Sequence, residues 1–575
     1  MKNILSVLAI LLLSCKVYAH SFSAVCPTGQ TLYYFILNDS TVSVGFPGNN
    51  TVTSVPWGGY TKPVGSLIIP ESVIYEGTTY SVKRITYNAF FGCDSLTSVT
   101  IPNTVVSIGN YSFQNCTRLD SVVIPHSIGT IGSQAFAGCD ELSYVNFTGS
   151  IAEWCKIHFA GNTSNPLYYA NHLYINDSEV TVLDIPDAVD TIHNYAFYKC
   201  QGIDTAIIGK SVVSIGEDAF WNCSGLTTLY FNADSCSALP HIYHNPFSAC
   251  FSLTSLIIGD SVKRIPDYMM DGINSLANVT IGSAVKYIGE NAFLDCSSLS
   301  RVNYTGTIAD WCGIQFQSWG NPILTAHNLF INDVEVTTLE IPDTVQSISS
   351  AAFNTCYSLT SVVLPESITS IGVAAFYRCN NITDFYSKRE TAPTIGNNSI
   401  PTTALIHIPC GSSLSYHARW GYEYTYTEEL MYELTVNADD NTHGTTTILQ
   451  QPSCNNNAVI QATASPNYAF SHWSNGVTSN PYTLTVNSDT TITAIFEPIN
   501  GIEDNDAIYA KVYFSQGRIV VEGADGNTVT LFDLNGRTIA TKQYYGTAIC
   551  FDVPASGTYM IKIGNRAPKK VVVMR

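Results

Sequence analysis

Charged residues are scarce in this sequence: Asp, Glu, Lys and Arg make up 12% of its 575 residues, against roughly 25% in an average protein. Positive charge is the scarcer kind, with 26 Lys and Arg against 45 Asp and Glu and a formal net charge of −19 at pH 7. Because little is available to neutralise phosphate, we expect no nucleic-acid partner. After residue 19 no stretch reaches the roughly 20 apolar residues of a membrane-spanning helix, so the chain should not span a membrane.

Catalytic signatures are missing as well. The chain contains no Gly-x-Ser-x-Gly, His-Glu-x-x-His or phosphate-binding-loop pattern. Cys236, His241 and His244 lie in one loop, but their spacing matches no standard zinc site. We therefore predict no catalytic residues, no metal and no cofactor.

A 23-residue repeat occupies most of the chain. Phe90, Phe113 and Phe136 recur at this spacing, and each is followed three residues later by a cysteine. A fixed period of 20–30 residues indicates a solenoid of stacked turns. The Phe/Cys pair returns at Phe197/Cys200, Phe220/Cys223, Phe247/Cys250, Phe293/Cys296, Phe353/Cys356 and Phe376/Cys379, with Met270 and Ile273 in one degenerate copy.

Each turn can be interpreted from its pattern. Leu96, Val99 and Ile101 point inward from a short strand whose intervening residues point outward, and Pro102 ends that strand. The nine cysteines of the Phe/Cys pairs, the ladder cysteines, should point inward in parallel rather than at each other, so we expect buried free thiols. The pairing of the other cysteines does not follow from the sequence.

The array is itself duplicated. Phe90 to Phe220 (the first block) match Phe247 to Phe376 (the second block) at an offset of 156 or 157 residues. We expect about fourteen turns and a length of roughly 65 Å at about 4.8 Å per turn. Both blocks carry matching insertions: Ile151–Cys155 with Ile308–Cys312, Asn165–Leu167 with Asn321–Ile323, and Ile175–Asp177 with Ile331–Asp333.

The predicted fold is mainly β, with the solenoid followed by two small all-β domains. Lys2, an apolar run and Val17-Tyr18-Ala19 indicate a cleaved secretory signal, with a lipoprotein signal at Cys15 as the alternative. The predicted segments are a signal peptide (1–19), an N-terminal cap (20–83), the solenoid with its C-terminal cap (84–425), a β domain (426–498), a linker (499–506) and a second β domain (507–575).

Three resemblances to known families follow from these patterns. The Ala-Phe-x-x-Cys turn with Leu96–Pro102 resembles the BspA-like (Treponema pallidum-type) leucine-rich repeat. Residues 432–498, with Phe470, Trp473 and a terminal Thr491–Phe496 strand, are similar to divergent internalin B-type repeats. Residues 507–575 resemble the C-terminal sorting domain of the type IX secretion system in Gly517–Val521, Leu531–Arg537, Gly557–Tyr559 and Lys569–Val573.

These resemblances imply a secreted or outer-membrane surface protein of a Bacteroidetes-type bacterium. It would be an adhesin for an extracellular protein or glycan, with 507–575 engaging the secretion translocon. The alternatives are a glycan-binding accessory protein beside separate hydrolases and, less favoured, an enzyme. Asp184 and Glu340 could suggest a glycosidase pair, but about seven turns, on the order of 30 Å, separate them, whereas such pairs need roughly 5–9.5 Å.

Candidate ligand-binding residues are the large polar side chains expected to point outward from the strands. Aromatic residues and Arg dominate interface hot spots. The competing interpretation is purely structural, since Thr and Val simply suit exposed strands. The candidates are Tyr144, Asn146, Asp184, Tyr230, Arg301, Asn303, Glu340 and Tyr386.

Overall fold

The computed structural model describes residues 20–47, 56–236, 239–240, 245–499, 510–524 and 526–573. The predicted signal peptide, residues 500–506 of the predicted linker, His241 and His244 lie outside these ranges. The chain divides into two compact units, residues 1–428 and 429–575. Within the described ranges, no helix has the length and apolar character that crossing a membrane requires.

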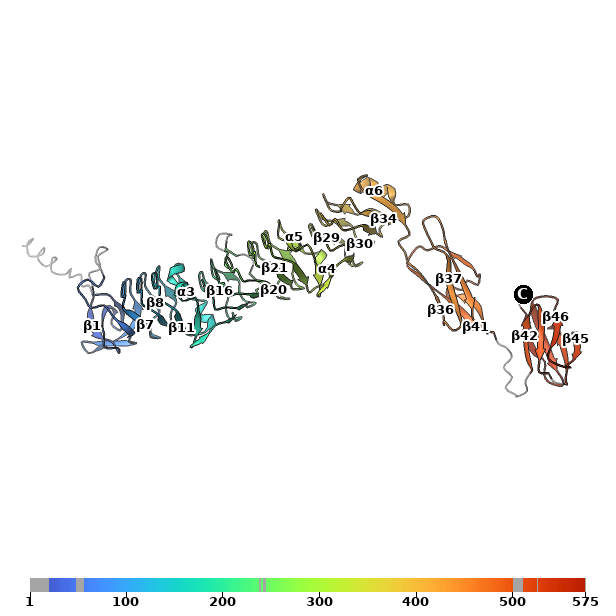
Figure 1. The fold of residues 1–575 in the computed structure, drawn as a ribbon, viewed down its shortest axis with the longest axis horizontal. Coiled ribbons are helices and arrows are strands. Elements are labelled where there is room, and N and C mark those ends of the chain that lie inside the picture. Colours follow the sequence, from blue (N-terminus) through green and yellow to red (C-terminus); the bar gives the residue numbers. More distant parts are fainter. Residues whose placement is uncertain are drawn as a thin grey trace, which may run out of the picture. The chain divides into compact units, whose positions relative to one another are not determined.

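The first unit is the predicted solenoid, with about 15 turns where fourteen were expected (Figure 1). Its longer strands pair in parallel with their neighbours and form one face, which we call the long-strand face. They are β4 (Gly65–Ile68), β7 (Leu96–Thr100), β9 (Ser121–Pro125), β11 (Tyr144–Thr148) and β13 (Leu173–Ile175); β15 (Val182–Asp184), β17 (Thr205–Ile208), β19 (Thr228–Phe231), β20 (Ser255–Ile258), β22 (Asn278–Ile281), β24 (Arg301–Tyr304) and β26 (Phe330–Ile331); and β28 (Thr338–Glu340), β30 (Ser361–Leu364), β32 (Asp384–Ser387) and β34 (Leu405–Pro409).

Two-residue strands form a second set of parallel ladders. The chain turns back towards the core directly after these strands, at Gly109 and its equivalents. A Cβ atom at Gly109 would lie 2.5 Å from the backbone nitrogen of Tyr87 in the preceding turn, which explains the glycine. These strands are β8 (Ser107–Ile108), β10 (Thr130–Ile131), β12 (His158–Phe159), β16 (Thr191–Ile192), β18 (Ser214–Ile215), β21 (Arg264–Ile265), β23 (Tyr287–Ile288), β25 (Gln315–Phe316), β29 (Ser347–Ile348), β31 (Ser370–Ile371) and β33 (Thr394–Ile395).

The core of the solenoid is a stack of identical side chains. Phe90 and Phe113 stack with their ring centroids 5.1 Å apart, and Phe113 and Phe136 follow at 5.2 Å. The Cys116 thiol donates to the Phe90 carbonyl oxygen at 3.2 Å, and five further ladder cysteines bond to the preceding turn in the same way. All nine ladder cysteines are buried and free, as predicted. Outside the ladder, Cys410 and Cys454 are disulfide-bonded.

Both ends of the array carry additional elements. Strands β1 (Phe22–Val25), β2 (Thr31–Asn38), β3 (Thr41–Gly45), β5 (Ser72–Tyr75) and β6 (Thr78–Ile85) extend the short-strand ladder and cover its first turn. Helix α6 (Ser413–Trp420) and β35 (Thr425–Glu429) follow the last long strand. Such coverage protects the open edges of a solenoid. The insertions form α2 (Ile151–Trp154), η1 (Asn162–Ser164), α3 (Leu167–Ala170), α4 (Ile308–Cys312) and α5 (Ile323–Ala326).

The second unit contains two β modules, each with its own core. In the first, the sheets have the orders β36-β41-β39 and β37-β38-β40. In the second, the orders are β42-β43-β46 and β45-β44-β47-β48. The strands are β36 (Leu434–Ala438), β37 (Gly444–Gln450), β38 (Ala458–Ala464), β39 (Tyr468–Trp473), β40 (Tyr482–Leu484), β41 (Thr490–Pro498), β42 (Lys511–Ser515), β43 (Arg518–Glu522), β44 (Thr528–Phe532), β45 (Thr538–Gln543), β46 (Ile549–Asp552), β47 (Gly557–Ile563) and β48 (Lys569–Val573).

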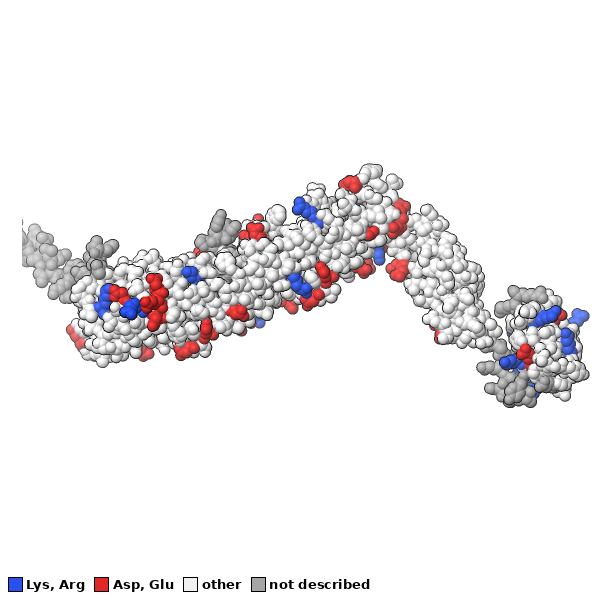
Figure 2. Space-filling view, viewed as in Figure 1, with Lys and Arg blue, Asp and Glu red and all other residues white. Residues whose placement is uncertain are grey.

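Charge is thinly spread over the surface that this fold creates. Figure 2 shows a visible face that is mostly uncharged, with isolated acidic groups and few basic ones along the solenoid. Solvation there depends on hydroxyl and amide side chains.

Candidate functional site

Two β-hairpins interrupt the long-strand face at equivalent places in the two blocks. The first joins β13 to β14 (Ser178–Glu179), and the second joins β26 to β27 (Val334–Glu335). Asn176 and Asp177 at the first tip have φ of 48° and 65°, and Asn332 and Asp333 at the second have 48° and 66°. Two consecutive left-handed residues are typical of a tight hairpin turn, which favours Asn and Asp.

Side chains from the neighbouring long strand hold each hairpin tip. Asp177 Oδ1 accepts hydrogen bonds from the Tyr144 hydroxyl at 3.0 Å and from Asn146 Nδ2 at 2.6 Å. The second block repeats this with different chemistry: Arg301 pairs with Asp333 at 2.8 Å, and its guanidinium lies 3.9 Å from the centre of the Phe330 ring. Partial desolvation, together with the Asp177 carboxylate, raises the pKa of Tyr144.

Four candidate residues therefore have structural partners. Asn146 and Asn303 were expected to point outward into solvent, but they are only 3% and 6% exposed. Each accepts a hydrogen bond from the backbone nitrogen of the hairpin aspartate, Asp177 or Asp333, at 3.0 and 2.9 Å. The hairpin covers them, because the turn that follows the inserted strand folds over the sheet. The Ile-Asn-Asp sequence that both insertions share marks the hairpin tips, although it does not reveal their contacts with Asn146 and Asn303.

Between the hairpins, the outward side chains of the long-strand face lie in two registered rows. Strand pairing aligns Tyr230 with Ile207 on one side and Ile257 on the other. Tyr230 is 39% exposed, and both isoleucines are half-buried. The rows are Val182, Thr205, Thr228, Ser255, Asn278 and Arg301, and Asp184, Ile207, Tyr230, Ile257, Thr280 and Asn303.

Of the remaining candidates, Asp184 lies in the same row as Tyr230, two strands away, whereas Glu340 and Tyr386 lie beyond the second hairpin. Asp184 and Glu340 are exposed on β15 and β28, the first strands after each hairpin. Tyr386 stacks on the buried His407 ring at 4.1 Å, and His407 Nε2 lies 3.0 Å from Asp384 Oδ1. Hydrogen bonds from Thr383 and then His407 lower the pKa of Asp384. The eight candidates are thus not gathered into one site.

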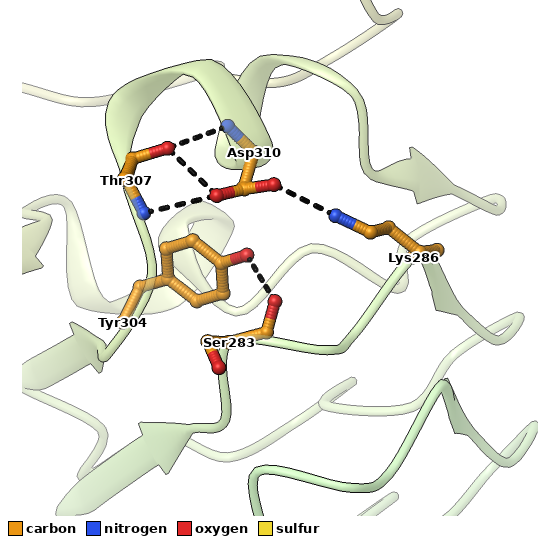
Figure 3. A network of polar contacts seen from close by, with 5 residues as sticks. All are labelled: Ser283, Lys286, Tyr304, Thr307 and Asp310. Atoms are coloured by element: carbon orange, nitrogen blue, oxygen red, sulfur yellow. Dashed lines mark hydrogen bonds and ion pairs between the residues drawn. The ribbon is translucent and has the colours of Figure 1, made fainter.

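The polar network around helix α4 is structural. Thr307 and Asp310 form a capping box, in which the Asp310 backbone nitrogen donates to Thr307 Oγ1 at 3.1 Å and the Thr307 hydroxyl donates to the Asp310 carboxylate at 2.7 Å (Figure 3). Lys286 Nζ pairs with the same carboxylate at 2.9 Å, and the Tyr304 hydroxyl donates to the Ser283 carbonyl at 3.0 Å. Such caps satisfy the first amides of a helix. In the described ranges, no three His, Cys, Asp or Glu side chains are placed to hold a metal.

Comparison with known proteins identifies the repeats. The family model described as a BspA type leucine rich repeat region matches residues 78–178, 168–300 and 325–437, more than half of the chain. A divergent InlB B-repeat domain matches residues 432–500, which confirms the second resemblance. No curated protein matches the chain.

Solved structures of several leucine-rich repeat proteins are similar to this chain at low sequence identity. A protein from Bacteroides ovatus is 20% identical, with 69% of this chain and 98% of that chain covered and a TM-score of 0.37. A leucine rich cell surface protein from Faecalibacterium prausnitzii is 19% identical, with 64% and 94% covered and a TM-score of 0.26. The pneumococcal vaccine antigen PcpA is 14% identical, with 71% and 99% covered and a TM-score of 0.25.

Proposed function

Because the chain belongs to the family of BspA-type leucine-rich repeat proteins, we propose that it is a secreted or cell-surface bacterial adhesin. Proteins with these repeats are typically found at the cell surface. In this proposal the long-strand face binds a protein or glycan of a host or a neighbouring cell. The internalin-type module at 432–500 acts as a spacer.

One observation supports the long-strand face as the binding surface. Tyr230 is 39% exposed between two half-buried isoleucines, and among the described residues its hydroxyl has no hydrogen-bond partner. A tyrosine with an apolar ring and an unused hydroxyl is typical of interface hot spots. The hairpins bound this stretch on both sides, so it is a defined area rather than an open sheet.

The binding test compares two tyrosines in the full chain. A panel of matrix proteins and a glycan array would identify the ligand, and affinity would be measured for Tyr230→Ala and Tyr422→Ala. Tyr422, which follows α6, is 84% exposed and lies outside the long-strand face. We expect Tyr230→Ala to weaken binding about 30-fold, as for a hot spot of roughly 2 kcal/mol, and Tyr422→Ala to leave it unchanged. Equal affinities would overturn the assignment.

We also propose that residues 1–19 direct the chain out of the cytoplasm and that residues 507–575 then engage an outer-membrane translocon. The support is the resemblance of 507–575 to type IX sorting domains, together with its independent core. Deleting 507–575 should leave the protein in the periplasm. Peptide mapping of the surface form should find a new N-terminus near His20 and no Arg575. Normal export of the deletion variant would exclude the sorting role.

A further inference from the structure

The middle sheet of the long-strand face contains an area without charge. The outward side chains of four consecutive strands, β17, β19, β20 and β22, include no Asp, Glu, Lys or Arg. Depletion of charged residues is typical of the centre of a protein interface. We call this area the uncharged patch; it consists of Thr205, Ile207, Thr228, Tyr230, Ser255, Ile257, Asn278 and Thr280.

An apolar row crosses the strands of the uncharged patch. Ile207, Tyr230 and Ile257 lie in register on three adjacent strands. The two isoleucines are half-buried, and Tyr230 between them is exposed. Neighbouring strands lie about 4.8 Å apart, so the row extends roughly 10 Å along the solenoid axis.

The two ends of the apolar row differ in charge. Asp184 is aligned with Ile207 on the preceding strand, β15, and is exposed. Among the described residues, no Lys or Arg forms an ion pair with the Asp184 carboxylate. Beyond the other end, Arg301 is already paired with Asp333 at 2.8 Å. The row therefore has a free negative charge at one end only.

We propose that the uncharged patch binds an amphipathic α-helix of a partner protein, which lies along the apolar row with its N-terminus towards Asp184. This inference rests on the adhesin role proposed above. Successive helical turns are about 5.4 Å apart, close to the step of about 4.8 Å between strands. Apolar residues at positions i, i+3 and i+7 of the helix contact Ile207, Tyr230 and Ile257. A Lys or Arg one turn earlier reaches Asp184, where the helix N-terminus adds partial positive charge.

Two other classes of ligand fit the apolar row less well. Side chains on one face of an extended strand are about 6.7 Å apart, so they do not stay in register with a step of about 4.8 Å. A glycan on the row would place sugar hydroxyls against the side chains of Ile207 and Ile257, which offer no hydrogen bond, and burying an unpaired polar group is unfavourable. The row therefore favours a protein ligand.

The second block provides an internal control. At the offset of 156 residues, Tyr386 corresponds to Tyr230 and Asp384 to Thr228. Tyr386 stacks on the buried His407 ring at 4.1 Å. An apolar helix face laid there would bury the Asp384 carboxylate, which is costly. We therefore expect the helix to bind the first of these two areas and not the second.

The first test uses the full chain and a library of helical peptides of about 16 residues, with Lys at position 1, Leu at positions 5, 8 and 12 and varied polar residues elsewhere. A control library has the same composition but places the leucines at every second position, as in a strand. Fluorescence anisotropy measures the affinities. We expect the best helical peptide to bind at least about tenfold more tightly than any control peptide. Equal binding of the two libraries, or no helical peptide bound at millimolar concentration, would overturn the inference.

Variants of the chain then locate the peptide. Ile257→Thr, which suits an exposed strand and should keep the melting temperature, should weaken binding of the best peptide severalfold. Asp184→Asn should weaken it severalfold and remove its salt dependence, because salt screens the ion pair with the peptide lysine. The matched changes in the second block, Tyr386→Ala and Glu340→Gln, should alter neither property. Full binding by both Ile257→Thr and Tyr230→Ala would place the peptide elsewhere and refute the site.

The panel of matrix proteins and glycans separates this inference from the adhesin proposal. A glycan ligand that requires Tyr230 but binds Ile257→Thr fully would support the adhesin and refute the helix. A panel ligand that binds Tyr230→Ala as tightly as wild type would remove the long-strand face from the adhesin proposal, and the peptide measurements would then decide the helix site alone.

Discussion

The two blocks of the solenoid show which side chains the architecture requires. Trp154 and Trp311 are equivalent, both fully buried, and donate to the carbonyls of Ala196 and Ala352 at 2.8 and 2.9 Å. In contrast, the equivalent pairs Tyr144/Arg301 and Trp221/Tyr377 differ in chemistry. Side chains that bond to the core of a neighbouring turn are the same in both copies, whereas those on the surface have diverged. Divergence therefore points to the places where the blocks do different work.

The largest predicted effect is a loss of folding stability at alkaline pH, which should be the same in both blocks. Burial raises the pKa of Cys155 in the first block and of Cys312 in the second to about 12, and it does the same for Cys200 and Cys296. An ordinary thiol has a pKa of about 8.5, and each pKa unit corresponds to about 1.4 kcal/mol.

Because these pKa values are raised on folding, the stabilisation is complete below about pH 8.5 and is lost as pH rises towards 12. Urea denaturation at pH 7, 9 and 10.5 should show a falling midpoint, with both blocks losing hydrogen-exchange protection together. A midpoint that is independent of pH would contradict the buried thiol ladder.

Next in size are the buried tryptophans. Trp154→Ala and Trp311→Ala should each lower the free energy of unfolding by about 3–5 kcal/mol, because each leaves a large cavity. Each also removes the indole hydrogen bond to the Ala196 or Ala352 carbonyl, which keeps its second hydrogen bond, from Asn165 or Asn321. Urea denaturation of the full chain measures the loss. Trp319→Ala serves as the control, since this side chain is 66% exposed and should cost less than about 0.5 kcal/mol. Unequal losses for the two buried residues would show that the insertions are not equivalent.

A smaller and more local effect concerns the hairpin tips. Asn146→Ala and Asn303→Ala each remove the acceptor of the hairpin aspartate's backbone amide, a partly buried hydrogen bond whose loss costs about 1 kcal/mol. We expect faster hydrogen exchange in residues 173–180 for the first variant and 330–336 for the second, with the adjoining turns unaffected. Unchanged exchange combined with weaker ligand binding would restore these residues as binding candidates.

The smallest effect separates Tyr144 from Arg301. The Arg301–Asp333 pair is partly solvated, with side chains 35% and 78% exposed, so Arg301→Ala should cost about 0–1 kcal/mol. Added salt screens this pair, and the difference between wild type and variant should shrink in 0.5 M NaCl. Tyr144→Phe removes a neutral hydroxyl and should show no such salt dependence. Equal salt responses would mean that the ion pair contributes nothing.

Much of the fold could be predicted because the core residues repeat at a fixed spacing. The Phe90 and Cys93 positions recur wherever a turn must stack on another, so the solenoid, its ladder and its duplication follow from the sequence. Helix α6 (Ser413–Trp420) lies in the region predicted to end with a C-terminal cap. The repeat spacing does not predict how an insertion contacts the sheet. For this reason Asn146 and Asn303 were expected to be exposed.

Other features were missed for similar reasons. Phe470 and Trp473 were identified from the sequence, but not that residues Tyr468–Trp473 form strand β39, which places Trp473 in the core. Strand β37 was not predicted, because Gly444–Gln450 lacks a buried apolar alternation.

The hairpins have a mechanical consequence. Because β14 and β27 each end a run of parallel strands, the backbone hydrogen bonding of the long-strand face is divided into three sheets. Hydrogen-bonded neighbours open together, while a break in the ladder lets one group open before the next. A tethered molecule pulled by its bound ligand should therefore lengthen in three steps, with the breaks just after residues 179 and 335. In the proposed adhesin, such stepwise extension would limit the load on the bond to the ligand.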